Sequence, residues 1–367
     1  MLKTDSPEVI RSFNVGLAIS TFLIVLTGLL TLFSASRGPG LQSLTKLQGV
    51  YFFAGCILAA AIIFIDSDFL KKVAYPAYGV CLGLLALVLV VGHVGNGSQR
   101  WINLGFFRLQ PSEFAKIAII LALARYFSDE KKGGPYSLKR LILPALLIVP
   151  YFVLIKKQPD MGTAGIVFLT AASMILFIGV EWKSIFLVMM VTMISLPLAY
   201  KYVLHDYQRN RVKTFLNPMS DPRATGYNAL QCRIAVGSGK VLGKGYMEGT
   251  QAQLNFIPEQ HTDFIFSVFA EERGFVGALL LLGLYASYLL FSVRSILRAR
   301  DKFELLVAVG LTAVMFWHVF INIGMVIGVL PIVGVTLPFF SYGGSSMMMF
   351  MICTALLLNI SRKRYIF

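Results

Sequence analysis

Long apolar segments separated by short polar ones dominate this chain. Apolar runs lie near residues 15–35, 47–65, 73–92, 112–128, 141–155, 163–180, 184–204, 263–293, 304–329 and 338–360. Most have close to the 20 residues that a helix needs to cross a bilayer. A run that crosses lipid must be helical, because a helix satisfies its backbone hydrogen bonds within one segment. The pattern predicts an all-α polytopic membrane protein with about ten transmembrane helices, forming one integral domain over residues 1–367.

The eighth run is too long for one crossing. At about 1.5 Å per residue, residues 263–293 would extend well beyond the roughly 30 Å hydrocarbon core. The run also contains Glu271, Glu272 and Arg273, followed by Gly274. We therefore expect a half-helix or re-entrant segment that starts at Asp263 and breaks near Gly274. Such backbone is stable only where it is buried in protein or lines a wet cavity.

Composition and charge agree with a membrane protein. The chain is 57% hydrophobic and only 14% charged, whereas soluble proteins have about 25% charged residues. A net charge of +15 would suggest nucleic-acid binding in a soluble protein. Here Lys and Arg lie between apolar runs, where cytoplasmic loops collect them. The charge therefore predicts membrane topology and no nucleic-acid partner.

The basic residues also predict the orientation. The short outside loops contain only Arg37, Lys46, Arg100, Arg108, Lys156 and Lys157. With the N-terminus inside, the cytoplasmic segments contain a larger set: Lys3, Arg11, Lys71, Lys72, Lys131, Lys132, Lys139, Arg140, Lys183, Arg294, Arg298, Arg300, Lys302, Arg362, Lys363 and Arg364. Both termini are therefore predicted to be cytoplasmic.

A long polar segment, residues 205–262, separates the seventh and eighth runs and is predicted to be a large extracytoplasmic loop. Loops of this length are usually functional or disordered. Its aromatic and aliphatic residues and its Gly-rich turns at 237–239 and 243–245 indicate an ordered loop. It leads directly into the eighth run.

Ionisable residues enter apolar runs at three places on the predicted outer side. In the first, Pro111 suits an initial helical turn and Ser112 a cap. Glu113 and Lys116 lie three residues apart on one helix face. They form either a structural ion pair, with Lys116 reaching outward to water, or an anion site. In the anion site, Arg108 and Lys116 would face a pyrophosphate and Glu113 would orient the lysine.

The second place is Asp160, which directly precedes the sixth run. Its carboxylate is explained equally well as a cap for the helix that follows and as part of a functional site. Lys156 and Lys157, just before it, could contact phosphate.

The third place holds His261 and Asp263. An Asp at the centre of a spanning helix costs roughly 2.5–3.5 kcal/mol, and less near the interface. Burial would raise its pKa toward the range useful for a general base, and upstream cations would oppose part of that rise: Arg209, Arg211, Lys213, Arg233 and Lys244. His261 competes as the base because its ordinary pKa is near neutrality. A helix cap is the structural alternative for Asp263.

Small and polar residues recur in the last two runs. Asn322 and Gly324 lie in the ninth run, and the segment SYGGSS (341–346) lies in the tenth. Small residues of this kind allow helices to pack closely. A flexible wall of a groove through which lipid enters is the alternative.

Several motifs together resemble the shape, elongation, division and sporulation (SEDS) family. In chain order they are QRWI (99–102), QPSE (110–113), QPD (158–160), DYQR (206–209), GY (226–227), HTDFIF (261–266) and SYGGS (341–345). Their order and spacing match over nearly the whole chain. GTQAQ (249–253) and the short tails resemble the rod-shape branch of the family more than its division branch.

The resemblance implies a fold with ten spans and an enzyme that polymerises lipid II into glycan strands on the outer face of the cytoplasmic membrane. It places the family's catalytic Asp on Asp263, its important Glu and Lys on Glu113 and Lys116, and the acid of the QPD motif on Asp160. Two positions depart from the usual pattern, where Arg273 and Met161 each replace a common leucine. Arg273 leaves the helix geometry there open.

The resemblance also implies partners and a mechanism. The partners are a class B penicillin-binding protein, which cross-links the strands, and other membrane proteins of the elongation complex. Asp263 would deprotonate an acceptor hydroxyl in a single inverting displacement that releases polyprenyl pyrophosphate. Arg108, Lys116, Arg209 or Arg211, or a divalent ion (Mg or Mn) bound through the pyrophosphate, would offset the charge of the leaving group. The predicted substrate-binding residues are Glu113, Lys116, Arg108, Asp160, Arg209, Arg211, Lys244 and His261. No metal-ligand cluster is visible in the sequence.

Two other classes of protein fit part of the pattern. A lipid II flippase would also have many spans with buried charges, but it should need charged groups accessible from both faces. Glu113, Asp160 and Asp263 all map to the outer side, which favours the enzyme. A non-catalytic scaffold for the penicillin-binding protein would tolerate substitution of Asp263 and Lys116.

Overall fold

The structure is a computed structural model that describes residues 13–37, 41, 43–95, 98–103, 105, 108–131, 133–202, 206–220, 225–254 and 256–362. The predictions for the two chain ends therefore concern residues outside these ranges. The same is true of single basic residues used to predict the orientation, namely Lys3, Arg11, Lys132, Lys363 and Arg364.

Over these ranges, ten long helices correspond to the ten apolar runs. They are α2 (Val15–Ala35), α3 (Ser43–Ile62), α4 (Ser67–Val91), α5 (Pro111–Asp129), α6 (Ile142–Lys157), α7 (Met161–Ile178), α8 (Trp182–Tyr202), α12 (Ile265–Leu297), α13 (Lys302–Val326) and α14 (Gly344–Ser361). The prediction of an all-α polytopic membrane protein is confirmed.

Eight helices in this part of the chain are long and apolar enough to cross a membrane. The two long helices that do not qualify are α5, which contains Glu113, Lys116 and Arg125, and α8, which is strongly apolar only over Trp182–Ser195. The number of ten spans therefore remains a prediction.

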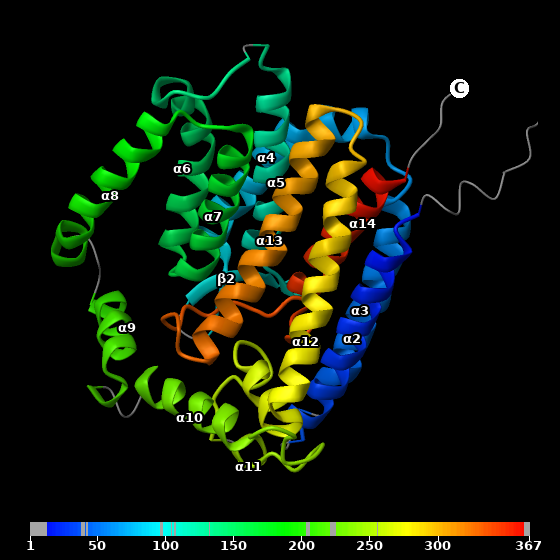
Figure 1. The fold of residues 1–367 in the computed structure, drawn as a ribbon, viewed down its shortest axis with the longest axis vertical. Coiled ribbons are helices and arrows are strands. Elements are labelled where there is room, and N and C mark those ends of the chain that lie inside the picture. Colours follow the sequence, from blue (N-terminus) through cyan, green and yellow to red (C-terminus); the bar gives the residue numbers. More distant parts are fainter. Residues whose placement is uncertain are drawn as a thin grey trace, which may run out of the picture.

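Helix α13 lies inside the bundle and packs against α5, α7, α12 and α14 (Figure 1). On one side α2 packs against α12, and α3 packs against α14. In both α13 and α14, 78% of the apolar window is buried inside the protein. Polar side chains on these two helices therefore face other protein groups, and they need hydrogen-bond partners there.

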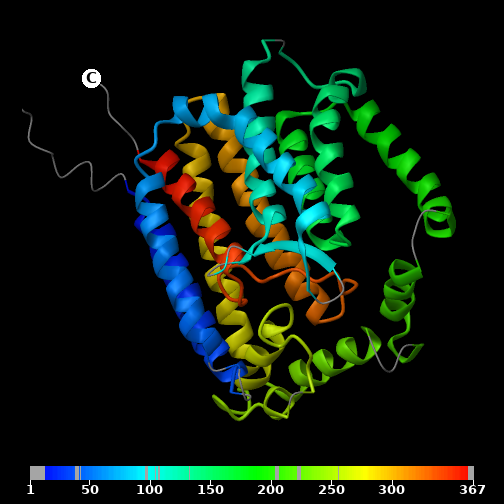
Figure 2. The same cartoon turned by 180° about the vertical axis from the view of Figure 1, so that it is seen from behind.

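Helix α8 stands away from the other helices in both views (Figures 1 and 2). Its large apolar side chains are exposed on several sides; Trp182 is 84%, Phe186 66% and Met193 76% exposed. Apolar side chains in this number are stable only in contact with lipid or another apolar surface. Their exposure agrees with a membrane environment for α8.

A small antiparallel sheet lies between α4 and α5, which the sequence pattern does not predict. Its strands, in order, are β1 (His93–Gly95), β2 (Ser98–Asn103) and β3 (Arg108–Leu109). The sheet leads into α5, which has Pro111 in its first turn, as predicted, and Gln110 as its N-cap. The prediction that Ser112 caps this helix is wrong, because Ser112 lies inside it and accepts a hydrogen bond from Gln110 Nε2 (3.1 Å).

The long loop between α8 and α12 is ordered where it is described, as predicted. It contains α9 (Asp206–Leu216), a short 3₁₀ helix η2 (Pro218–Ser220), α10 (Thr225–Ser238) and α11 (Thr250–Gln253). These elements lie along one end of the bundle (Figure 1). A second 3₁₀ helix, η1 (Leu138–Leu141), leads into α6.

Helix α12 is interrupted at Gly274, whose backbone (φ 64°, ψ −163°) is not helical. A segment of the long loop fills the break. The N–H of Phe275 donates to the carbonyl of Lys240 (2.9 Å), and the N–H of Lys244 donates to the carbonyl of Glu271 (3.0 Å). Backbone groups freed by the break thus regain hydrogen bonds. The prediction of a break near Gly274 is confirmed.

Candidate active site

Asp263 lies just before α12, against the connection between α13 and α14. Its backbone carbonyl accepts a hydrogen bond from Asn322 Nδ2 (2.9 Å), which also donates to the carbonyl of Val335 (2.6 Å). A Cβ added at Gly334 would lie 3.2 Å from Asp263 Oδ2. The helix begins at Ile265 with Phe264 as its N-cap. The alternative interpretation of Asp263 as a helix cap is therefore wrong, and its carboxylate is left for another role.

The surroundings of Asp263 favour its protonated form. Burial is the largest effect and, together with the negative charges of Glu259 and Asp160, raises the pKa of Asp263 to about 6; the cations Arg100 and Arg211 oppose part of this rise. A carboxylate with such a pKa is still largely ionised at neutral pH, and it is more basic than an ordinary aspartate. Both properties suit a general base.

His261 lies beside the same segment. Its Nε2 is 3.8 Å from Glu259 Oε2, and its ring centroid is 6.2 Å from that of Tyr342. Its backbone carbonyl accepts from the N–H of Tyr342 (2.9 Å). Burial lowers the pKa of His261, and Glu259 opposes this. The imidazole is therefore mostly neutral at pH 7 and stays an alternative base.

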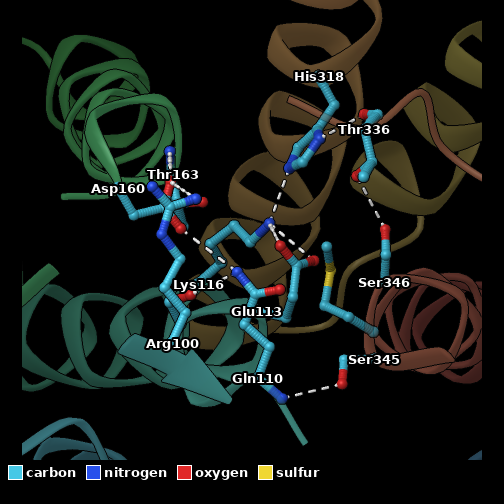
Figure 3. A network of polar contacts seen from close by, with 12 residues as sticks. Arg100, Gln110, Glu113, Lys116, Asp160, Thr163, His318, Thr336, Ser345 and Ser346 are labelled. Carbon is cyan, nitrogen blue, oxygen red and sulfur yellow. Dashed lines mark hydrogen bonds and ion pairs between the residues drawn. The ribbon is translucent and has the colours of Figure 1, made fainter. Parts of the chain in front are cut away.

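Asp160 combines a structural and an electrostatic role (Figure 3). Its Oδ1 accepts from the N–H of Thr163 (3.2 Å), so it caps α7 as one of the two interpretations predicts. Its Oδ2 accepts from Gln110 Nε2 (3.3 Å), and Arg100 lies 3.9 Å from Oδ1. Arg100 Nε also donates to the carbonyl of Gln158 (3.0 Å). The β2 strand thus holds the start of α7, and Asp160 is near enough to act on Asp263.

Glu113, Lys116 and His318 form a buried chain. Lys116 Nζ is 3.0 Å from each carboxylate oxygen of Glu113 and 2.8 Å from His318 Nε2. The predicted ion pair is present, but Lys116 is 0% exposed. The prediction that it reaches outward to water is wrong. Lys116 also offers no surface to a pyrophosphate in this structure, because the surrounding helices cover it.

The other predicted cations are placed differently from one another. Arg108 is exposed on β3, close enough to Tyr342 to counter part of the rise in pKa that burial causes there. Arg211 acts on Asp263. Arg209 donates to the carbonyls of residues 200 and 201 at the end of α8 (3.0 and 2.8 Å). Lys244 pairs with Glu271 (2.6 Å) at the break in α12, which is a structural role.

Three residues near the site have contacts there that the sequence does not predict. They are His318, Arg100 and Asn322. A histidine in the middle of an apolar helix was a usable signal, because ionisable groups at membrane depth usually have a function. For Asn322 the sequence pattern leaves close packing and the wall of a groove as alternatives, whereas in the structure its amide donates to the carbonyls of Asp263 and Val335. Arg100 lies in the QRWI motif of the resemblance, but the sequence did not show its partner, since Asp160 lies 60 residues away along the chain.

Within the described residues, no group of three or more His, Cys, Asp or Glu side chains is placed to hold a metal ion. The charges of Asp160 and Glu259 raise the pKa of Asp263, but the three carboxylates do not form such a group. A cation here would need most of its ligands from a bound molecule.

Comparison with known proteins identifies the family. The model of the FtsW, RodA and SpoVE cell cycle protein family matches residues 14–366. The chain belongs to this family. Peptidoglycan glycosyltransferase MrdB of Escherichia coli K12 is 42% identical over 287 residues, covering 78% of this chain and 77% of that protein. Stage V sporulation protein E of Bacillus subtilis is 37% identical over 377 residues, covering 99% of both.

Solved structures of the family share this fold. A chain from a peptidoglycan synthase complex that coordinates polymerisation and crosslinking superposes with a TM-score of 0.84 at 35% identity, covering 96% of this chain and 98% of that one. The rod shape determining protein RodA of Thermus thermophilus gives a TM-score of 0.72 at 32% identity, with the same coverage. With the apolar helices, these comparisons show an integral membrane protein of the SEDS family.

Proposed function

We propose that this protein is a peptidoglycan glycosyltransferase that polymerises lipid II into glycan strands during cell-wall elongation. The observation that carries the proposal is Asp263, a partly buried carboxylate with a pKa of about 6 at the junction of α12 with the α13–α14 connection. MrdB of Escherichia coli bears the name of this activity, which supports the same conclusion.

The proposed reaction is one displacement. The 4-hydroxyl of an acceptor sugar attacks the anomeric carbon of the donor, and Asp263 takes the hydroxyl proton as the new glycosidic bond forms. The bond from that carbon to the pyrophosphate oxygen breaks, and polyprenyl pyrophosphate leaves with the electron pair. An α-linked donor then gives a β-linked product, so one base is sufficient and no covalent enzyme intermediate is needed.

The departing pyrophosphate needs positive charge close to the reacting centre. The positive charges of Arg211 and Arg100 both lower the pKa of Asp263, and Arg108 is exposed beside Tyr342. We assign charge compensation to Arg108 and Arg211. We do not assign it to Arg209, which donates to backbone carbonyls at the end of α8, or to Lys244, which is paired with Glu271. Lys116 is excluded from direct contact by its burial.

A divalent cation, Mg or Mn, is a further proposal for the same step. Such ions bind to phosphate oxygens with one or two protein carboxylates. Asp160 and Glu259 are the carboxylates whose charge reaches Asp263. Such a cation would take most of its ligands from the pyrophosphate and would offset charge on the leaving group.

The proposal includes an orientation and a partner. The site faces the outer side of the bacterial cytoplasmic membrane, and both termini are cytoplasmic, as the distribution of Lys and Arg predicts. The partner is a class B penicillin-binding protein, within an assembly of other elongation membrane proteins. The similar chain in a synthase complex that couples polymerisation to crosslinking supports this partner.

The test uses purified protein with its class B partner and fluorescent lipid II, with glycan strands resolved on a gel. Wild type should form strands, and Asp263→Ala should form none while it melts at the same temperature and binds the same partner. His261→Gln is the control for the alternative base and should keep most of the activity. Translocation of lipid II in vesicles, without strands from the wild type, would instead indicate a flippase. Full activity of Asp263→Ala would contradict the assignment of the base to Asp263 and leave His261 to be tested.

A further inference from the structure

Two side chains on one face of α13 hold the α13–α14 connection. His318 and Asn322 are four residues apart, which places them one turn apart on the same side of the helix. His318 Nδ1 is 3.0 Å from the carbonyl oxygen of Thr336, and Asn322 Nδ2 is 2.6 Å from that of Val335. Asn322 also donates to the carbonyl of Asp263. This face of α13 therefore positions the connection and Asp263 together.

The hydrogen bonds of Lys116 determine the state of His318 (Figure 3). An ammonium group has three donors and no acceptor. Two of the donors of Lys116 reach the carboxylate of Glu113, and the third reaches His318 Nε2. Nε2 must therefore accept, so the ring proton is on Nδ1 and donates to the Thr336 carbonyl. Every donor of Lys116 is used, and the chain runs from Glu113 to Thr336.

The connection in turn borders the carboxylate of Asp263. Gly334, two residues before Thr336, is close enough that an added Cβ would lie 3.2 Å from Asp263 Oδ2. On its other side the connection packs against the start of α7, where a Cβ on Gly162 would lie 2.7 Å from the Val333 carbonyl. Any shift of residues 333–336 therefore changes the space and the access of water at Asp263.

We propose that His318 is a positioning residue for Asp263, and that Lys116 acts on the reaction through His318 rather than on the leaving group. This inference rests on the proposed function, because it takes Asp263 as the base. Glu113, Lys116 and His318 are buried and hydrogen-bonded to one another. The hydrogen bond from His318 to the Thr336 carbonyl therefore holds that carbonyl in place. Thr336 Oγ1 is in turn 3.0 Å from Ser346 Oγ on α14.

Two substitutions distinguish the roles of the two ring nitrogens of His318. In His318→Gln the amide can reach Lys116, but no donor remains at the Nδ1 position. In His318→Asn the amide occupies the Nδ1 position and can donate to Thr336, while Lys116 loses one acceptor. Positioning through Thr336 requires that Asn preserves activity better than Gln. A direct role of Lys116 on the substrate requires the opposite order.

The measurement is the initial rate of strand formation against lipid II concentration and pH, with melting temperatures for all variants. We expect His318→Gln to lower kcat about 10- to 100-fold, as misplaced catalytic groups do, with KM changed by about twofold or less. The pH below which its rate falls (the acid limb) should also shift to a lower value. Burial, Glu259 and Asp160 raise the pKa of Asp263, and Arg100 and Arg211 oppose them; more water at Asp263 would weaken the effect of burial and so lower this pKa. His318→Asn should keep most of kcat and the position of the limb.

Trp317→Phe is the matched control, since it removes a hydrogen bond from the neighbouring residue of α13 to Ser173 (3.0 Å). It should lower the melting temperature without changing kcat or the acid limb. Equal loss of kcat in His318→Gln and His318→Asn, or a wild-type kcat and limb in His318→Gln, would overturn the positioning role. Strand formation by Asp263→Asn at the wild-type rate would overturn the assignment of the base on which this inference rests, and the absence of strands from the wild type would overturn the proposed function. If the wild type is active and Asp263→Asn is inactive, the two His318 variants test the positioning role alone.

Discussion

At the scale of single residues, the environment of Asp263 explains why this carboxylate differs from the other acids of the site. Asp160 caps α7 and binds Gln110, and Glu113 is paired with Lys116, so both have hydrogen-bond donors that stabilise their charge. By contrast, burial and the negative charges of Glu259 and Asp160 disfavour the charged form of Asp263 and raise its pKa. Asp263 is therefore a stronger base than an ordinary aspartate.

This difference predicts a pH dependence. A general base must be deprotonated, so kcat/KM should rise with pH and level off above about 6, the pKa of Asp263. Below that value kcat/KM should fall about tenfold for each pH unit, because one group must lose its proton. The pKa of the unliganded protein applies, since kcat/KM reports groups of the free enzyme. His261→Gln should leave this acid limb in place. A limb near pH 4, or one that disappears in His261→Gln, would contradict the assignment of the base to Asp263.

The residues around Asp263 show what a sequence can predict about a site. The acid itself was predictable, because a carboxylate at the entry to an apolar run is costly and needs a reason. Its partners were not, because Arg100, Asp160 and Asn322 meet it only through the fold. The burial of Lys116 was also not predictable, since a lysine one turn into a helix can equally reach water.

At the scale of elements, regular structure is interrupted at two places that shape the fold around the site. Helix α12 is interrupted at Gly274 and α13 ends at Val326, after which an irregular connection leads to α14. The sequence predicted the first break from length, charge and a glycine. It did not predict the β1–β3 sheet, because strands of two to six residues carry too little periodicity to be distinguished from loops.

The break in α12 predicts a contrast between two glycines of the same helix. At Gly274 an added Cβ would lie 2.3 Å from Gly243 N, and its backbone (φ 64°, ψ −163°) is in a region that is essentially restricted to glycine. Gly274→Ala should therefore destabilise the protein by about 1–3 kcal/mol or more. Gly283→Ala meets no atom within 4 Å and should be neutral or stabilising by up to about 1 kcal/mol.

Thermal melting in detergent would compare the two variants with the wild type. Equal melting temperatures for Gly274→Ala and Gly283→Ala would show that the helix is not broken at Gly274. A lower melting temperature for Gly283→Ala alone would contradict the packing of α12.

At the scale of the whole molecule, the long helices pack as one unit. The long helices form one bundle around α13, and the α9–α11 segment lies along one end together with the break in α12 (Figures 1 and 2). From its runs of apolar residues the sequence predicted the long helices and the single integral domain, but not which helices pack against one another. It did not predict that α8 would stand apart from the bundle, because apolar side chains that face lipid and those that face protein look alike in sequence.

The predicted orientation can be tested with single cysteines. Met219, 69% exposed in η2, should lie outside, and Gly133, exposed between α5 and α6, should lie inside. After replacement of the four native cysteines, a membrane-impermeant maleimide on protoplasts should label Met219→Cys. It should label Gly133→Cys only after the membrane is opened. The reverse pattern would place the site on the cytoplasmic side and contradict the orientation.

The most direct test of the central claim is the initial rate of strand formation by Asp263→Asn, with lipid II binding measured on the same preparation. The substitution keeps the size of the side chain and removes its basicity. If Asp263 is the base, the variant should bind lipid II about as well as the wild type and form strands at least about 100-fold more slowly, since general-base catalysis typically contributes 10²–10⁴-fold. Strand formation at the wild-type rate would contradict the claim and leave His261 as the base to be tested.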